Sequence, residues 1–293
     1  MPVILRLVSI VAALLQRVGL LRMLPRVADQ ARGMRPIPLP VPTARGGVWG
    51  DDDAHGVALF VGCIADPWFS DLHKASIEVL VRAGYRVDAP VDQTCCGALA
   101  AHGGFASEAD KLATRNIAAL GNQDAVAVDV AGCGAHLKQY ARYGQGGAAV
   151  AAKTHDITQL VAAAIVDGKL PTLARSGIEV GVQDPCHLEH GQGIVDEPRA
   201  VLEAGGFTVI DIDAGGLCCG AAGAYQLHHP ETGEVLGRQK AKKVEESGTK
   251  IVATANGGCE IQLRRFLDSG YTVRHPIELY AEALREFGVA DAE

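Results

Sequence analysis

The eight cysteines of this 293-residue chain form one pattern that occurs twice. Three cysteines of the first half recur 123 residues later, and the fourth recurs 126 residues later. The equivalent pairs are Cys63 and Cys186, Cys95 and Cys218, Cys96 and Cys219, and Cys133 and Cys259. Each half therefore supplies four thiols, the number that ligates one iron–sulfur cluster.

Three other uses of these cysteines compete with that interpretation. Adjacent cysteines such as Cys95 and Cys96 have Cα atoms about 3.8 Å apart, shorter than the usual disulfide span of roughly 4.4–6.8 Å, and the chain has no clear secretory signal. Structural zinc usually brings Cys-x₂₋₄-Cys pairs, which this sequence lacks. Ordinary buried cysteines would not be expected to recur in register. Iron–sulfur ligation is the favoured interpretation.

A glycine follows each adjacent cysteine pair, at Gly97 and Gly220. Neighbouring side chains of an extended segment point to opposite sides, so aiming two thiols at one cluster requires a sharp bend. Glycine allows that bend and a close approach of the backbone to inorganic sulfide. Backbone N–H groups of such a loop can also donate hydrogen bonds to cluster sulfurs.

The repeated Cys, Cys-Cys-Gly and Gly-Cys motifs resemble those of the cysteine-rich CCG domain family over residues 57–287. This family includes the cysteine-rich subunit of heterodisulfide reductase, the lactate-utilisation iron–sulfur protein and the glycolate oxidase iron–sulfur subunit. The second half is the more specific match and reads most like the C-terminal part of the glycolate oxidase subunit. The matching segments are Asp184–Leu188, His190–Gln192, Leu217–Gly220, Ala253–Cys259 and His275–Leu279.

The resemblance implies an iron–sulfur electron-transfer subunit of a glycolate or 2-hydroxy-acid oxidase-type complex. Electrons would pass from flavin-containing partner subunits to a quinone or another acceptor, through one cluster per half, expected to be [4Fe–4S]. The chain would then be the non-flavin subunit of an oxidoreductase. No cysteine precedes Cys63, so the ferredoxin-like domain of the glycolate subunit would lie on a separate chain.

The sequence departs from the heterodisulfide reductase pattern, in which each unit ends in Cys-x-x-Cys. Val130 and Asn256 stand at the first position of that pair. This departure disfavours the alternative function, in which the chain is an enzyme that reduces a disulfide or another substrate directly at a cluster. The Asn256 amide can still donate a hydrogen bond to a cluster sulfur, whereas Val130 cannot.

Histidines near the cysteines are further candidates. His187 directly follows Cys186 and can donate to a cluster sulfur or carry a proton, so His187 and Asn256 are the expected cofactor-binding residues besides the cysteines. A solvent-facing or helix-capping role is the alternative for a histidine here. Neither a Ser-His-Asp motif nor a flavin-binding fingerprint points to a catalytic residue. His190 is a candidate for the same roles as His187, and His136, three residues after Cys133, for an equivalent role in the first half. The residues that could line a shared cleft are His102, Tyr225 and His228.

Strands and helices alternate along both halves, which predicts an α/β fold of two duplicated, Rossmann-like units with mostly parallel sheets. The expected organisation is an N-terminal helix and Pro-rich linker over 1–50, a first CCG unit over 51–170 and a second over 171–293. One expected helix covers 107–120 and begins with Ser107 as its cap. Four cysteines follow predicted strands, so each set of four is expected at the carboxyl ends of a sheet. The expected strands are 57–62, 85–89, 125–130, 179–183, 208–212 and 251–254.

Composition excludes some classes of protein. The net charge of −7 argues against general nucleic-acid binding, which requires a basic face, and no apolar run reaches the length of about 20 residues that spans a bilayer. Residues 3–24 predict a largely apolar helix that packs on the body or on a partner, with binding to a membrane surface as the alternative. The expected location is the cytoplasm, with the inner face of the membrane as a further option.

Overall fold

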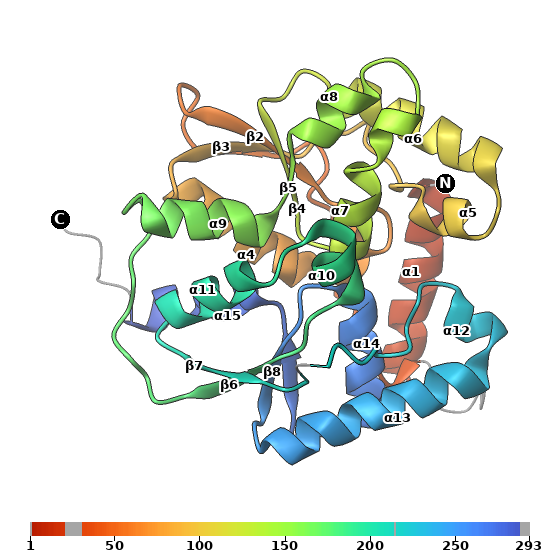
Figure 1. Ribbon diagram of the computed structural model, residues 1–293. Helices are drawn as coiled ribbons and strands as arrows, with labels where there is room; N and C mark the ends of the chain where they lie inside the picture. The colour runs from red at the N-terminus through yellow and green to blue at the C-terminus, as the bar shows by residue number, and fades with distance from the viewer. Residues whose placement is uncertain (1, 21–30, 214, 288–293) are drawn as a thin grey trace.

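Two open sheets, one from each half of the chain, form the framework of the protein (Figure 1). The computed structural model describes residues 2–20, 31–213 and 215–287. The first sheet has the order β1-β3-β2-β4-β5 and the second the order β7-β6-β8-β9. Their strands are β1 (Val48–Trp49), β2 (His55–Phe60), β3 (Tyr85–Asp88), β4 (Ala125–Val128), β5 (Thr154–Asp156), β6 (Glu179–Val182), β7 (Thr208–Asp211), β8 (Ile251–Ala253) and β9 (Thr272–Arg274).

The two sheets repeat the same topology. Strands β3-β2-β4-β5 of the first sheet correspond in order to β7-β6-β8-β9 of the second, and all pairings within these two sets are parallel. The additional strand β1 pairs antiparallel with the edge strand β3. The predicted fold class, two duplicated α/β units with parallel sheets, is confirmed.

Helices cover both faces of each sheet, as parallel strands require. Four of them, α4, α9, α11 and α15, lie in a layer between the two sheets, while α6 and α8 lie on the outer side of the first sheet and α13 on the outer side of the second (Figure 1). The helices are α1 (Pro2–Arg17), α3 (Ala65–Trp68), α4 (Ser70–Arg82), α5 (Ala98–His102), α6 (Ala106–Leu120), α7 (Ala131–Leu137), η2 (Tyr140–Arg142), α8 (Gly147–Ala152), α9 (Ile157–Val166), α10 (Cys186–Gln192), α11 (Asp196–Ala204), α12 (Tyr225–His228), α13 (Pro230–Ser247), α14 (Gly257–Phe266) and α15 (Pro276–Phe287).

The largest hydrophobic core belongs to both halves. Helix α15 of the second half packs on α4 of the first, and α9 of the first packs on α11 of the second. Buried side chains from both halves, such as Leu72, Val161, Val201 and Tyr280, form one cluster. Burying apolar surface in this shared layer stabilises the two halves together.

Several local predictions need correction. Ser107 does not cap α6, because the helix begins one residue earlier at Ala106 and has Phe105 at its cap position without a side-chain hydrogen bond. Strand β4 ends at Val128 rather than Val130, which becomes the extended residue before α7.

The N-terminal helix ends at Arg17 rather than continuing to residue 24, and residues 21–24 of that prediction lie outside the described residues. One face of α1 packs on the body: Ala13 is fully buried, and Ser9 accepts a hydrogen bond from the Trp68 indole at 3.1 Å. The opposite face exposes Leu7 and Val11 to solvent by 57% and 54%. None of the described helices is both long enough and apolar enough to cross a bilayer.

Candidate functional site

The structure brings the cysteines of each predicted set together at the carboxyl ends of the strands. Cys186 Sγ lies 4.0 Å from Cys218 Sγ, and Cys219 Sγ lies 3.2 Å from Cys259 Sγ. In the first half the equivalent contacts recur, with hydrogen bonds between Cys63 and Cys95 and between Cys96 and Cys133. All eight cysteines are free thiols. The repeated spacing in the sequence thus corresponds to two similar thiol groups in space.

The bend predicted at each Cys-Cys-Gly loop is present. Gly97 has φ +91° and Gly220 has φ +81°, both in the left-handed region that favours glycine. A Cβ atom on Gly220 would lie 2.7 Å from the carbonyl oxygen of Gly233, so the loop also packs too closely for a side chain. The Gly220 N–H donates to Cys218 Sγ at 3.4 Å. The turn therefore aims two adjacent thiols inward and adds a backbone donor to one sulfur.

Close contact between the thiols lowers the pKa of some cysteines and raises the pKa of others. Hydrogen bonds from Cys63 and then Cys96 lower the pKa of Cys95 to about 3. Its neighbour Cys96 has a raised pKa, because its thiol bonds to Cys133 and then Cys95 and is buried. The second half repeats this order, with the pKa of Cys218 lowered by Cys186 and that of Cys219 raised by Cys218. The pKa values of neighbouring thiols are thus shifted in opposite directions, and a bound cation or cluster would favour the thiolate form throughout.

A buried polar pair holds the first Cys-Cys-Gly loop in place. The Asn116 side chain accepts from the Thr94 N–H at 2.7 Å and donates to the Cys95 carbonyl at 2.9 Å. The hydroxyl of Tyr140 donates to the Cys96 carbonyl at 2.7 Å. Asn116 and Tyr140 are both fully buried. Neither residue was singled out from the sequence, because no local pattern indicates that its side chain reaches the Cys-Cys-Gly loop.

The second loop is held by an ion pair instead. Lys240 on α13 is 1% exposed and lies 3.1 Å from an oxygen of Asp213. The same carboxylate oxygen accepts from the Leu217 N–H at 2.7 Å, directly before Cys218. The charge of Lys240 contributes to the lowered pKa of Cys218, after the hydrogen bonds of the neighbouring thiols and the Gly220 N–H. The two groups of thiols therefore have different electrostatic surroundings.

Asn256 connects the loops of the two groups. Its Nδ2 donates to Cys259 Sγ at 3.3 Å, and its Oδ1 accepts from the Gly132 N–H at 3.3 Å, next to Cys133. One residue away, the Ala131 N–H donates to the Ala255 carbonyl at 3.0 Å. Asn256 was expected to donate to a cluster sulfur; the structure shows its contact with the Cys259 sulfur, and the bond to a cluster remains a prediction. Its contact with the first half could not be read from the sequence.

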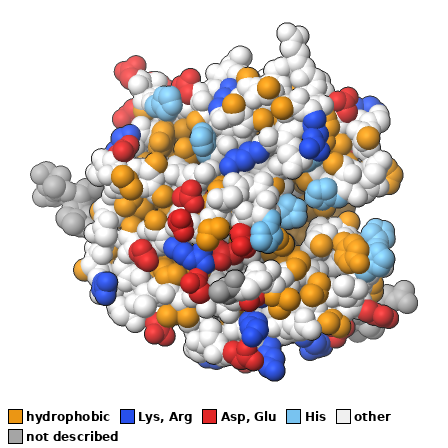
Figure 2. All heavy atoms as spheres, in the orientation of Figure 1, with side chains coloured by type: hydrophobic (Ala, Val, Ile, Leu, Met, Phe, Trp, Pro, Cys, Tyr) orange, Lys and Arg blue, Asp and Glu red, His pale blue; other side chains and the backbone are white. Residues whose placement is uncertain are grey.

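A cleft of about 310 Å³ lies between the two halves beside the cysteines. Its lining includes Cys186 and four histidines, and Figure 2 shows histidines gathered beside a hollow on this face. Two of these rings, those of His102 and His187, lie 5.9 Å apart. The lining histidines are His102, His136, His187 and His190.

Two of these histidines have pKa values below that of a free imidazole. Burial, and then the charges of His102 and Arg142, lower the pKa of His136 to about 4. Burial and His102 also lower the pKa of His187. Among the described residues no hydrogen bond joins His187 to a sulfur, so its expected contact with a cluster remains a prediction. Tyr225 and His228, also expected at a shared cleft, are absent from this lining; Tyr225 stacks on His229 instead.

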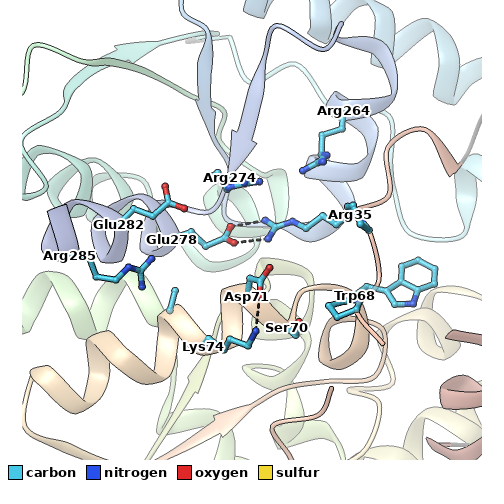
Figure 3. Close-up of a pocket in the computed structure, with 13 residues that line it drawn as sticks. Arg35, Trp68, Ser70, Asp71, Lys74, Arg264, Arg274, Glu278, Glu282 and Arg285 are labelled. Atoms are coloured by element: carbon cyan, nitrogen blue, oxygen red, sulfur yellow. Dashed lines mark hydrogen bonds and ion pairs between the residues drawn. The ribbon is translucent and has the colours of Figure 1, made fainter. Parts of the chain in front are cut away.

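A buried ion network includes Glu260 of α14, the residue directly after Cys259. The Arg35 guanidinium binds Glu260 with two hydrogen bonds of 2.5 and 2.6 Å and Glu278 with two of the same lengths. Figure 3 shows the Arg35–Glu278 pair. The Arg35 side chain is 8% exposed, so this network fixes the segment before the first unit onto the second.

The donor set fits an iron–sulfur cluster in each half: four sulfur ligands, a tight glycine turn and N–H donors directed at sulfur. In the described part of the chain, no group of three or more His, Cys, Asp or Glu side chains is arranged to hold a single metal ion. His187, His190 and Asn256 lie beside the thiol groups, whereas the acidic residues of the ion network lie behind them.

Comparison with known proteins identifies the repeated unit. The model of the cysteine-rich domain named CCG matches residues 57–138 and 180–264, which together make up more than half of the chain. One subunit of the fumarate reductase (CoM/CoB) of Methanothermobacter marburgensis is 33% identical over 221 residues, covering 75% of this chain and 44% of that protein.

Two other relatives match a similar share of the chain. The glycolate oxidase iron–sulfur subunit of Escherichia coli is 30% identical over 240 residues, covering 78% of this chain and 58% of that protein. Lactate utilization protein A of Oceanobacillus iheyensis is 28% identical over 211 residues, covering 69% of this chain and 86% of that protein. The chain thus spans about half the length of the first two relatives.

Proposed function

Because this chain belongs to the family of the cysteine-rich CCG domain, we propose that it is an iron–sulfur subunit of an oxidoreductase that transfers electrons. The observation that carries this proposal is the pair of four-thiol groups at equivalent strand ends of two duplicated sheets. The names of the relatives, an iron–sulfur subunit among them, agree with it.

The proposed cofactor is one [4Fe–4S] cluster per half, ligated by the eight cysteines. When bound, each cluster would supply a one-electron carrier. In the second half, Gly220 and Asn256 hold hydrogen-bond donors at two of the sulfur ligands. Anaerobic purification followed by iron, acid-labile sulfide and zinc analysis tests this. We expect cysteine-ligated iron and sulfide; stoichiometric zinc without sulfide, in protein never exposed to air, would exclude the proposal.

The proposed partners are flavin-containing subunits that oxidise glycolate or another 2-hydroxy acid, and a separate ferredoxin-like chain. The protein alone should then not reduce a dye with glycolate or lactate, because flavin chemistry would take place on the partner. Co-purification from the native cell, with flavin analysis of the complex, tests the partnership. Robust substrate-dependent dye reduction by the isolated, flavin-free protein would contradict it.

An apolar pocket supports electron transfer to an apolar acceptor such as a quinone at the first cluster. The pocket has a volume of about 370 Å³ and is lined by Cys63, Cys95 and apolar side chains that include Val8 and Leu99. Val8 belongs to α1, which also carries the exposed Leu7 and Val11. We therefore propose that α1 associates with the inner surface of the cytoplasmic membrane, with its exposed face in the headgroup region.

Vesicle flotation tests this membrane association. Substituting Leu7 and Val11 by serine should reduce the vesicle-bound fraction, whereas substituting the exposed Val166 by serine should leave it unchanged. Equal flotation of both variants would count against a membrane role for α1.

The histidine-lined cleft favours a second candidate function, reduction of a substrate directly at a cluster. The histidines beside Cys186 could relay protons from solvent to the thiolates released when a disulfide is reduced. The missing fifth cysteine of each half, replaced by Val130 and Asn256, ranks this candidate second. Turnover of a small disulfide by the isolated, reduced protein would favour it over electron transfer.

A further inference from the structure

Two adjoining cavities lie beside the C-terminal end of α14, the end remote from Cys259. Their volumes are about 430 and 710 Å³, and both are lined by Arg264 and Arg274. The smaller one is drawn in Figure 3, where the side chains of Arg264 and Arg274 point toward one another above the Arg35–Glu278 pair. These two arginines stand at the boundary of the cavities.

The larger cavity is strongly basic in a protein of net charge −7. Its lining contains five arginines and a single carboxylate, Asp268. The hydroxyl groups of Ser269, Tyr271 and Thr272 also line it, so its polar side chains are mostly hydrogen-bond donors. The arginines are Arg32, Arg238, Arg264, Arg265 and Arg274.

Protein carboxylates do not neutralise all of this charge. Arg238 pairs with Glu234 at 2.8 Å. Arg264 lies 3.3 Å from Glu260, but that carboxylate is already bound by Arg35. Arg32 and Arg274 have no ion pair and no side-chain hydrogen bond with any residue that the structure describes.

The like charges act on one another. Burial lowers the pKa of Arg264, and the neighbouring charges of Arg35 and Arg274 lower it further against the opposing effect of Glu260. Guanidinium groups that face one cavity repel one another unless an anion joins them. The guanidinium group is also the side chain whose geometry matches carboxylate and phosphate oxygens in bidentate pairs.

We propose that Arg264 and Arg274 bind a small multivalent oxyanion, a di- or tricarboxylate or a phosphate-bearing molecule, in the larger cavity. One end of the ligand lies between these two guanidinium groups, and Arg32 contacts its outer end. The site is formed by three separate parts of the chain: the segment before the first unit, the end of α14, and β9. It is independent of the proposed electron-transfer function.

Isothermal titration of the anaerobically purified full-length protein tests the site. The probes are citrate, inorganic phosphate and, as a monovalent control, acetate, all at the same ionic strength because salt screens such interactions. We expect saturable binding of citrate, of phosphate or of both with one site per chain, and no saturable binding of acetate. The two multivalent probes distinguish a carboxylate ligand from a phosphate ligand.

Variants locate the binding. Arg274→Gln should weaken it at least tenfold and Arg274→Lys by less, because lysine keeps the charge but loses the forked geometry. Arg115→Gln, an exposed arginine on α6, is the matched control and should bind as the parent protein does. Circular dichroism checks that each variant is folded.

Two results would overturn the proposal. One is an equal effect of all three anions on all variants, which would indicate screening alone. The other is saturable binding of a polyglutamate peptide when neither citrate nor phosphate binds, which would assign the basic cavity to an acidic protein segment.

Discussion

Replacing Asn256 by valine should lower the reduction potential of the second cluster selectively. Asn256 stands before α14 as Val130 stands before α7, and both residues have extended backbones there. Of these two side chains, that of Asn256 donates a hydrogen bond to a cysteine sulfur, Cys259 Sγ, at 3.3 Å, and that of Val130 has no donor. Asn256→Val therefore gives the second half the side chain of the first, and Val130→Asn makes the reverse change.

The magnitude follows from the one hydrogen bond that is lost. A hydrogen bond to a charged group contributes about 1.5–3 kcal/mol. It is present in both oxidation states, so only its strengthening on reduction, roughly 1 kcal/mol, changes the potential. Since about 1.4 kcal/mol corresponds to about 59 mV for a one-electron couple, the potential should fall by roughly 40 mV. Loss of the contact with Gly132 should reduce the unfolding free energy by about 1 kcal/mol as well.

Redox titration followed by electron paramagnetic resonance measures this effect. A Cys96→Ser background removes the signal of the first cluster, so that the second can be titrated alone. Val130→Asn should raise the potential of the first cluster, in a Cys219→Ser background. An unchanged potential in Asn256→Val with full iron content, or equal shifts of both clusters, would refute the reasoning.

Three further predictions concern the thiol groups, the ion network and pH. Cys219→Ser should reduce iron content more than Cys96→Ser does, because the closer family match of the second half predicts the better formed site there. Iron analysis of both variants measures this. Loss of all iron in Cys96→Ser and of none in Cys219→Ser would instead show that the second half is degenerate. Arg35→Met should destabilise the protein by about 3–5 kcal/mol, because it leaves the buried carboxylate of Glu278 without a cation and Glu260 with Arg264 alone, and calorimetry should show a fall in Tm of about 10 °C; a fall below about 2 °C would contradict this. Burial raises the pKa of Asp156 from 3.8 to about 6. Between these two pH values the folded state retains a proton that the unfolded chain loses. The free energy of unfolding therefore falls as pH rises from about 4 to 6, by at most about 3 kcal/mol. Asp156→Asn keeps the cap oxygen for the Thr158 N–H and should remove this loss in denaturation measured at pH 4 and pH 7; the same pH dependence in both proteins would exclude Asp156 as its source.

The duplication and the grouping of the cysteines into two sets could be predicted from the sequence. The same offset of 123 residues, from Cys63 to Cys186 and again from each cysteine of the first adjacent pair to its equivalent, defined the repeat. Gly97 and Gly220 predicted turns, which the structure confirms with positive φ values. Alternating strands and helices predicted parallel sheets with the cysteines at their carboxyl ends. These features are readable because they depend on local spacing and on the backbone freedom of single residues.

The ends of helices and strands were predicted less accurately than their existence. Ser107 was expected to cap α6, but the helix begins at Ala106, because the chain entering from Phe105 reaches helical geometry without a side-chain cap. The two- and three-residue strands β1, β5 and β9 were not predicted either. Segments this short carry too few residues for a periodic pattern, and the equally short β8 was predicted from its place in the repeat.

Only the tertiary structure decided what surrounds the cysteines. Arg35 meets Glu278 across 243 positions of sequence, and Asn256 meets Gly132 across 124. Arg264 and Arg274 belong to different elements, and their convergence on one cavity depends on how α14 packs beside β9. No local pattern encodes such contacts, because they arise from the packing of whole elements whose apolar faces are buried against one another in the shared core.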